Sequence, residues 1–232
     1  MYTRTVNGKE LEFGVSGKLY KDALVMFDRE TDTLWTQVDG TVLRGELEGA
    51  QLETIPLTQT TWKVWKELHP GTLVLEKDEE ITESNYAKYH SDQDRFGISG
   101  NQEPDERMDG KAMIVSLRDG LDALAIPVEK LELNLIHQTE LNGRPIVVVW
   151  NLGSRTVGAY ERSVDGESMD FYVTFQGNIL KMRDKKSGTE WNGLTGEAEW
   201  GERAGQALKP VPYMVNFWWA WAAYNPHTRI EP

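Results

Sequence analysis

The chain contains an internal repeat, and this feature constrains its fold more than any other. Residues 28–75 align without a gap with residues 184–231, and a shift of two residues upstream brings Tyr2 into line with Tyr160. Three tryptophan pairs fall in the ungapped register: Trp35 with Trp191, Trp62 with Trp218, and Trp65 with Trp221. Tryptophan is rare, so three such pairs do not arise by chance. The sequence therefore predicts two copies of one unit, 156 to 158 residues apart.

Each copy has the pattern of a β-rich unit. The dipeptides Asn7-Gly8 and Asp165-Gly166 tolerate the positive φ angles of a type I′ turn and predict hairpins. Strands are expected over 9–15, 24–27, 34–38, 41–43 and 167–175. One short helix per copy is expected near 60–69 and 216–225, capped by Thr60 and Asn216 and stopped by Pro70 and Pro226. We expect a mainly β fold with a few short helices (α+β), arranged as a tandem pseudo-two-fold repeat.

Different segments lie between the copies. Residues 76–110 are polar, with an acidic run over 78–80, and read as a connection with one helical turn near 84–90. Residues 111–159 are rich in strand signals: Asp119-Gly120 and Asn142-Gly143 predict hairpin turns, and 145–150 suits a buried strand. The predicted division is a first unit over 1–75, a polar connection over 76–110 and a second, complete unit over 111–232.

The first unit is expected to be N-terminally incomplete, because the second has strands ahead of Tyr160 that have no counterpart ahead of Tyr2. In order of preference, the native gene extends upstream, the strands of 111–150 serve both units, or a second chain covers the open edge. The last arrangement makes a homodimer, so the chain is expected to be a monomer or a homodimer.

Composition excludes several classes of function. The net charge is −12, and the one basic cluster, within 181–186, alternates as on the exposed face of a strand, so no nucleic-acid partner is expected. No apolar run approaches the roughly 18 residues of a membrane-spanning helix. The chain has no cysteine, which excludes disulfides, thiolate zinc sites and a cysteine nucleophile. Residues 92–103 partly fit a calcium loop, but Phe96 occupies a ligand position and the histidines lack metal spacing. No metal or cofactor is expected.

The repeat also separates fold from function. Residues present in both copies, such as the paired tryptophans and Asp28 with Asp184, are assigned to the core and to structural ion pairs. Polar residues found in the first copy alone are the candidate ligand-binding residues: Ser16, Arg29, Gln37, Thr61 and His69. Arg29 could bind an anion, and Gln37 could form a hydrogen bond without charge. His69 could act as an acid or a base. The alternative for His69 is a place at the C-terminus of a helix, where a cation suits the dipole.

Several motifs resemble the domain-of-unknown-function family 3179, found mainly in bacteria and archaea. They are Phe13–Gly17, Leu24–Arg29, Leu34–Gln37, Thr60–Trp62, His69-Pro70 and Phe217–Tyr224. The resemblance covers nearly the whole chain and implies no assigned activity. Members of the family often look exported and usually carry a Cys-Pro-x-Cys stretch near the N-terminus. That stretch is lacking here, and the resemblance suggests export of a longer precursor.

Two functions are consistent with this sequence. The first is a small-ligand-binding or scaffold module with a cleft between the repeats and a small molecule as its partner. The alternative is an enzyme of unknown reaction that uses Arg29, Gln37 and His69 of the first repeat. An enzyme requires these side chains to converge in one pocket, whereas a module leaves them dispersed.

Overall fold

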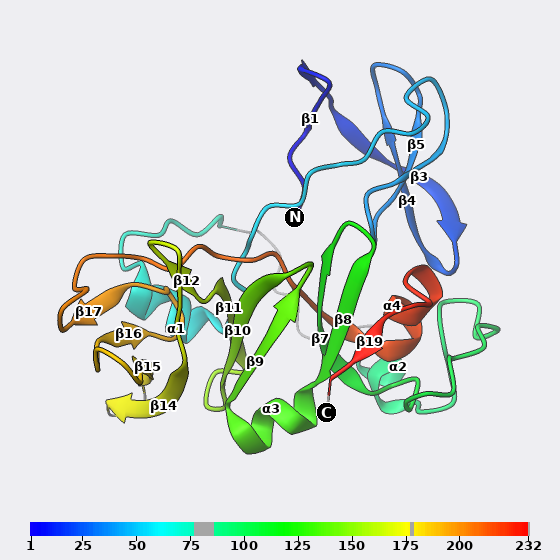
Figure 1. Ribbon diagram of the computed structural model, residues 1–232. Helices are drawn as coiled ribbons and strands as arrows, with labels where there is room; N and C mark the ends of the chain where they lie inside the picture. The colour runs from blue at the N-terminus through cyan, green and yellow to red at the C-terminus, as the bar shows by residue number, and fades with distance from the viewer. Residues whose placement is uncertain (77–85, 177–178, 232) are drawn as a thin grey trace. The chain divides into compact units, whose positions relative to one another are not determined.

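The computed structural model describes residues 1–76, 86–176 and 179–231. Across these residues the protein is mainly β with four short helices (Figure 1), as the sequence predicts. Backbone contacts define two compact units. Unit 1 comprises residues 1–57, 96–128 and 212–232, and unit 2 comprises residues 58–95 and 129–211. The predicted division at residues 75 and 110 follows the sequence repeat, whereas these two units are defined by backbone contacts. The predicted division therefore stays a prediction.

Unit 1 begins with a hairpin and a four-stranded antiparallel sheet. The hairpin joins β1 (Thr5–Val6) to β2 (Lys9–Glu10) through Asn7 and Gly8, whose φ angles of 51° and 78° confirm the predicted turn. The sheet has the order β3-β4-β5-β6. Its strands are β3 (Phe13–Tyr20), β4 (Ala23–Asp28), β5 (Leu34–Thr36) and β6 (Val42–Arg44). Trp35 is fully buried and packs with Val6, Leu11 and Leu52. The predicted strand 9–15 is wrong in one respect: it breaks between β2 and β3.

A second four-stranded sheet completes unit 1, in the order β18-β7-β8-β19. Its strands are β18 (Met214–Phe217), β7 (Met113–Asp119), β8 (Asp122–Pro127) and β19 (Arg229–Ile230). Helix α4 (Trp218–Tyr224) packs Trp218 and Trp221 against Ile114 and Ala125. The β7–β8 turn is centred on Gly120 and Leu121 rather than on Asp119-Gly120, because Asp119 pairs with Asp122.

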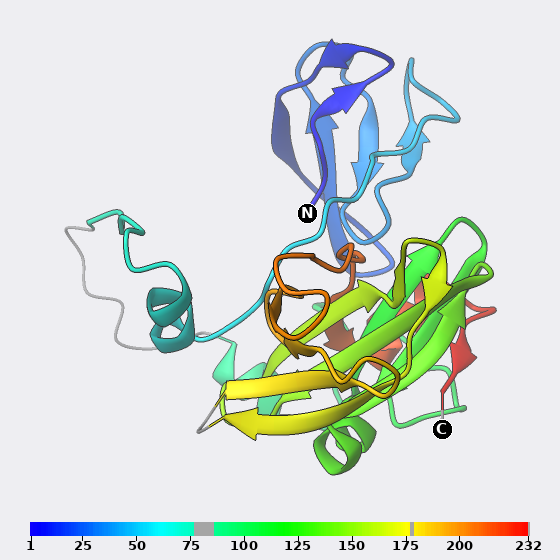
Figure 2. The ribbon, with the colours of Figure 1, turned by 60° about the vertical axis from the view of Figure 1, so that its left-hand side comes forward.

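Unit 2 contains two sheets and a hairpin. The three-stranded sheet, in the order β11-β10-β9, consists of β9 (Ile136–Leu141), β10 (Arg144–Asn151) and β11 (Thr156–Glu161). The hairpin of β12 (Ser163–Val164) and β13 (Glu167–Ser168) turns at Asp165 and Gly166, as predicted. The second sheet, whose β14–β15 pair is yellow in Figure 2, has the order β14-β15-β16-β17. Its strands are β14 (Phe171–Gln176), β15 (Ile179–Asp184), β16 (Glu190–Asn192) and β17 (Ala198–Trp200). Trp191 is the buried centre of this unit, packed with Phe171, Leu180 and Met182.

The other three helices are α1 (Trp62–Leu68), α2 (Ala87–Ser91) and α3 (Val128–Asn134). Helix α2 confirms a helical turn in the connection, although residues 77–85, including the acidic run, lie outside the described residues. None of the described helices is long and apolar enough to cross a membrane.

Helices α1 and α4 confirm the two predicted helices, but two details differ. The N-caps are Thr61 and Phe217, one residue later than predicted, because Asn216 belongs to β18. Trp62 is 50% exposed whereas Trp218 is fully buried. The assignment of Trp62 to the core was therefore wrong: helix α1 buries none of its residues, whereas α4 lies against the β7–β8 sheet.

Candidate functional site

Two predicted site residues have local structural roles in unit 1. The Ser16 hydroxyl donates a hydrogen bond of 2.6 Å to the carbonyl of Val25, across the irregularity between β3 and β4. Arg29 is exposed, pairs with the carboxylate of Glu12 at 2.9 Å and lies over the ring of Phe27. Both side chains therefore hold neighbouring strands in place.

Thr61 and His69 occupy the two ends of helix α1, in unit 2. The Thr61 hydroxyl accepts a hydrogen bond from the backbone N–H of Val64. His69 is the C-cap residue, and its ring centre lies 4.3 Å from that of Trp65. His69 thus lies at the C-terminus of a helix, as its alternative interpretation requires, and its role in binding or proton transfer stays a prediction. Because these residues belong to a different unit from Arg29 and Gln37, the five-residue site and the enzyme built on it stay predictions.

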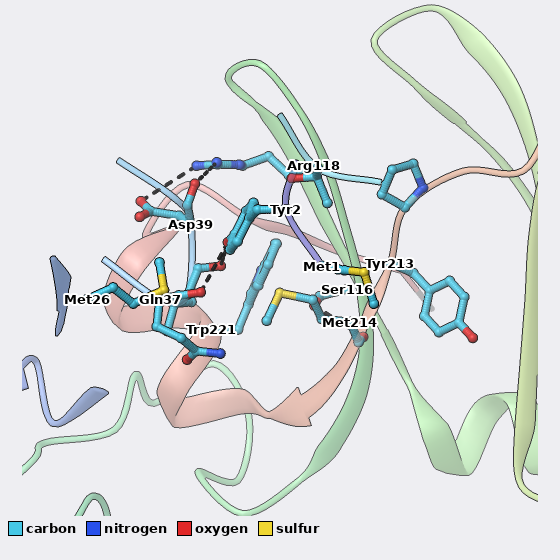
Figure 3. Close-up of a pocket in the computed structure, with 13 residues that line it drawn as sticks. Met1, Tyr2, Met26, Gln37, Asp39, Ser116, Arg118, Tyr213, Met214 and Trp221 are labelled. Carbon is cyan, nitrogen blue, oxygen red and sulfur yellow. Dashed lines mark hydrogen bonds and ion pairs between the residues drawn. The ribbon is translucent and has the colours of Figure 1, made fainter. Parts of the chain in front are cut away.

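Gln37 lines a cavity of about 250 Å³ within unit 1. Figure 3 shows Met26 and Gln37 on one side of this cavity and Ser116 and Met214 on the other. The lining comes from segments that are far apart in the sequence: the residues ahead of β1, β4, the β5–β6 turn, Thr54, β7, β18 with the residues ahead of it, and α4. None of the other four predicted site residues lines it.

Apolar side chains form much of the wall. The thioethers of Met26 and Met214 face the cavity together with the indole of Trp221, whose Nε1 is already bonded to the hydroxyl of Thr228 at 2.7 Å. The indole therefore offers a ring face rather than a donor. Thioethers are soft and adaptable in contact with aromatic groups, so this wall suits a flat apolar surface.

Tyr2 closes the cavity near the β5–β6 turn. Its hydroxyl lies 2.8 Å from the carbonyl of Val38 and 3.1 Å from that of Gln37, so its proton is used inside the protein. Burial and the negative charge of Asp39 raise the pKa of Tyr2 to about 12, against the opposing effect of Arg118. The phenol therefore stays neutral at physiological pH and does not serve as a base there.

Arg118 and Asp39 form the charged end of the site, as Figure 3 shows. The Arg118 guanidinium donates a hydrogen bond of 2.9 Å to the carbonyl of Asp39 and lies 3.7 Å from its carboxylate. That carboxylate also accepts hydrogen bonds from Thr36 and from the hydroxyl of Thr41, the latter at 2.9 Å. The two charges are thus compensated within the wall. Among the described lining residues, these are the side chains that are charged at neutral pH, and burial lowers the pKa of the α-amino group of Met1, which also lines the cavity.

The side-chain amide of Gln37 differs from these groups, because no hydrogen bond joins it to the described part of the protein. Both backbone groups of Gln37 form hydrogen bonds. Its N–H donates to the carbonyl of Leu24, and its carbonyl accepts from the hydroxyl of Tyr2. The amide is exposed and offers one acceptor and two donor hydrogens.

Sequence reasoning identified Gln37 but missed Tyr2, Ser116, Arg118 and Met214. A signal for two of them was present. Ser116 and Arg118 stand two residues apart in the apolar strand β7, so they share one face of it. Two polar residues at this spacing in a buried strand indicate that this face of the strand does not pack against the hydrophobic core.

The comparisons with known proteins place the chain in a family. The model of the family described as "Protein of unknown function (DUF3179)" matches residues 1–228. The chain therefore belongs to this family, as the motifs indicated. No curated protein and no solved structure matches it.

Proposed function

We propose that the protein is a small-ligand-binding module whose binding site is the cavity of unit 1. One observation carries this proposal: a 250 Å³ cavity with an apolar wall also contains a side-chain amide with no partner in the described protein. Ligand sites are typically concave and mostly apolar, with a few polar groups that orient the ligand. Gln37 supplies such a group, and Met26, Met214 and Trp221 supply the apolar wall.

We also propose that the chain is a tandem pseudo-two-fold repeat. Matched backbone bonds support it: Leu11 donates to Arg4 and Met169 to Arg162, both at 2.8 Å. Matched side-chain contacts do so as well: Phe13 with Trp35, Phe171 with Trp191, Trp65 with Thr72, and Trp221 with Thr228. The unequal exposure of Trp62 and Trp218 is one feature that departs from the pattern.

In the proposed repeat, the position of Gln37 corresponds to Gly193, and there the space is filled. Tyr160 donates to the carbonyl of Gly193 at 3.3 Å, much as Tyr2 does to that of Gln37. A Cβ atom on Gly193 would come within 2.2 Å of the Leu180 side chain. The second copy thus has no room for a side chain where the first copy presents an amide, which supports a binding role confined to the first copy.

Filling the cavity tests this proposal. Thr54 lines the cavity and is exposed, so Thr54→Trp should occlude it without burying an unpaired polar group. Ligand-detected NMR with a set of small uncharged aromatic compounds should show binding to the wild type and at least tenfold weaker binding to the variant. Glu53→Trp, at the neighbouring exposed position outside the lining, is the matched control. Absence of any binding to the wild type, or equal binding to both variants, contradicts the proposal.

A further inference from the structure

The cavity of unit 1 has properties that define the chemical class of its ligand. Liquid water takes about 30 Å³ per molecule, so a 250 Å³ space corresponds to about eight waters. A cavity of about 150 Å³ holds one benzene molecule, so this space has room for a slightly larger ligand. This is the size of one substituted aromatic ring.

The charge of the wall selects against ions. Arg118 is compensated by Asp39, whose carbonyl and carboxylate both lie beside the guanidinium. An anionic ligand would compete with Asp39 for Arg118 and would lie close to its carboxylate, and a cationic ligand would face Arg118. Since either charge would also lose part of its water on contact with the apolar part of the wall, a neutral ligand is favoured.

The amide of Gln37 selects for a complementary edge. A primary amide presents a donor and an acceptor side by side, and a second amide in the same plane satisfies both. A carboxylate offers acceptors alone and would leave the Gln37 carbonyl oxygen without a donor. The indole of Trp221 and the adaptable thioethers of Met26 and Met214 suit the apolar ring that carries such an edge.

We propose that the cavity of unit 1 binds a small, neutral, planar molecule with an amide-like donor–acceptor edge, which pairs with the side-chain amide of Gln37. This inference rests on the proposed function, since it names the ligand class of the same site. It assigns Gln37 as the residue that sets specificity, with Arg118 and Asp39 closing the site to charged compounds.

Benzamide, benzoate and toluene test the inference, because they share a ring and differ in the edge. Dissociation constants from ligand-detected NMR should show benzamide at least tenfold tighter than benzoate for the wild type. Gln37→Met, which keeps the length of the side chain and removes the amide, should weaken benzamide at least tenfold and leave toluene within about twofold, since both hydrogen bonds to the ligand are lost and tenfold corresponds to about 1.4 kcal/mol. Gln206→Met, at an exposed glutamine of unit 2, should change neither.

The outcomes separate this inference from the proposed function. If benzoate binds as tightly as benzamide, or if Gln37→Met leaves benzamide unchanged while toluene still binds, the ligand class is wrong and the binding module stands. If none of the three compounds binds the wild type, both proposals are overturned.

Discussion

The guanidinium of Arg118 donates a hydrogen bond to the backbone carbonyl of Asp39, at 2.9 Å, and the two residues are 79 positions apart in the chain. This contact fixes strand β7 against the β5–β6 turn and defines one end of the cavity in unit 1. No local pattern in the sequence predicts that these two segments lie in contact.

Removing Arg118 should therefore cost stability. Arg118→Ala takes away this hydrogen bond and leaves the Asp39 carboxylate, which is 12% exposed, without its cation. We expect the free energy of unfolding in urea to fall by about 1–2 kcal/mol, since both side chains are partly buried.

Arg29→Ala is the matched control, because Arg29 forms an exposed pair with Glu12. Exposed pairs contribute little, so the change should stay within about 0.5 kcal/mol. The effect of Arg29→Ala on ligand binding distinguishes the cavity of unit 1 from the site predicted from the sequence. The cavity does not include Arg29, so binding should survive the substitution, whereas the site predicted from sequence requires its loss at an unchanged melting temperature.

The two buried tryptophans at the sheet centres should respond differently to Trp→Phe. The Trp35 indole donates to the Asp28 carboxylate at 2.9 Å, whereas the Trp191 indole nitrogen is buried without a partner. Trp35→Phe should cost about 1–3 kcal/mol more than Trp191→Phe in urea denaturation, because it alone breaks a hydrogen bond to a buried charge. Equal costs would contradict this.

The contribution of the hydrogen bond between Trp35 and Asp28 to stability should also depend on pH in the acid range. Burial acts to raise the pKa of Asp28, but hydrogen bonds from Trp35 and Thr31 outweigh it, and the pKa lies below its ordinary value. The stabilisation is present above that ordinary value and is lost as pH falls through the lowered folded-state pKa. The stability advantage of the wild type over Trp35→Phe should therefore shrink as the pH falls below about 4. A constant difference would contradict the assignment.

Alkaline pH should lower the stability of the folded protein through ionisation of Tyr2. Burial raises its pKa in the folded protein to about 12, against 10.0 in the unfolded chain. The folded state favours the neutral phenol, so this contribution is fully present below pH 10 and is lost as pH rises towards 12. Between these values the wild type should lose roughly 2 kcal/mol more than Tyr2→Phe. Parallel losses in the two proteins would show that Tyr2 is not responsible.

Paired glycines test the repeat. Gly45 and Gly201 have φ angles of 139° and 105°, and a Cβ atom on each would lie 2.6 Å and 2.8 Å from the Cα atoms of Thr33 and Thr189. Alanine at either position should destabilise by about 3 kcal/mol or more, because the backbone must move. Gly49→Ala, where nothing lies within 4 Å, should cost about 1 kcal/mol. A tolerated alanine at one of the first two positions would count against equivalent copies.

Local features of the fold could be predicted from the sequence, and assembled ones could not. Asn7-Gly8 predicts its turn because the signal lies within two residues. Lys21 and Asp22 form the β3–β4 turn with φ angles of 48° and 57°, and this turn was missed because neither residue is glycine. Gln37 was found because its repeat partner is Gly193. Arg118 and Met214 were missed because their place in the site depends on the pairing of β7 and β18, which no local pattern encodes.

The methionine methyl groups test the binding site most directly. Met26 and Met214 line the cavity, whereas Met169 and Met182 are buried in the core of unit 2. In an NMR titration of methyl-labelled protein with benzamide and toluene, we expect the Met26 and Met214 signals to shift and saturate together, while those of Met169 and Met182 stay unchanged. Shifts confined to Met169 and Met182, or no shift at Met26 and Met214 at saturating ligand, would contradict a binding site in unit 1.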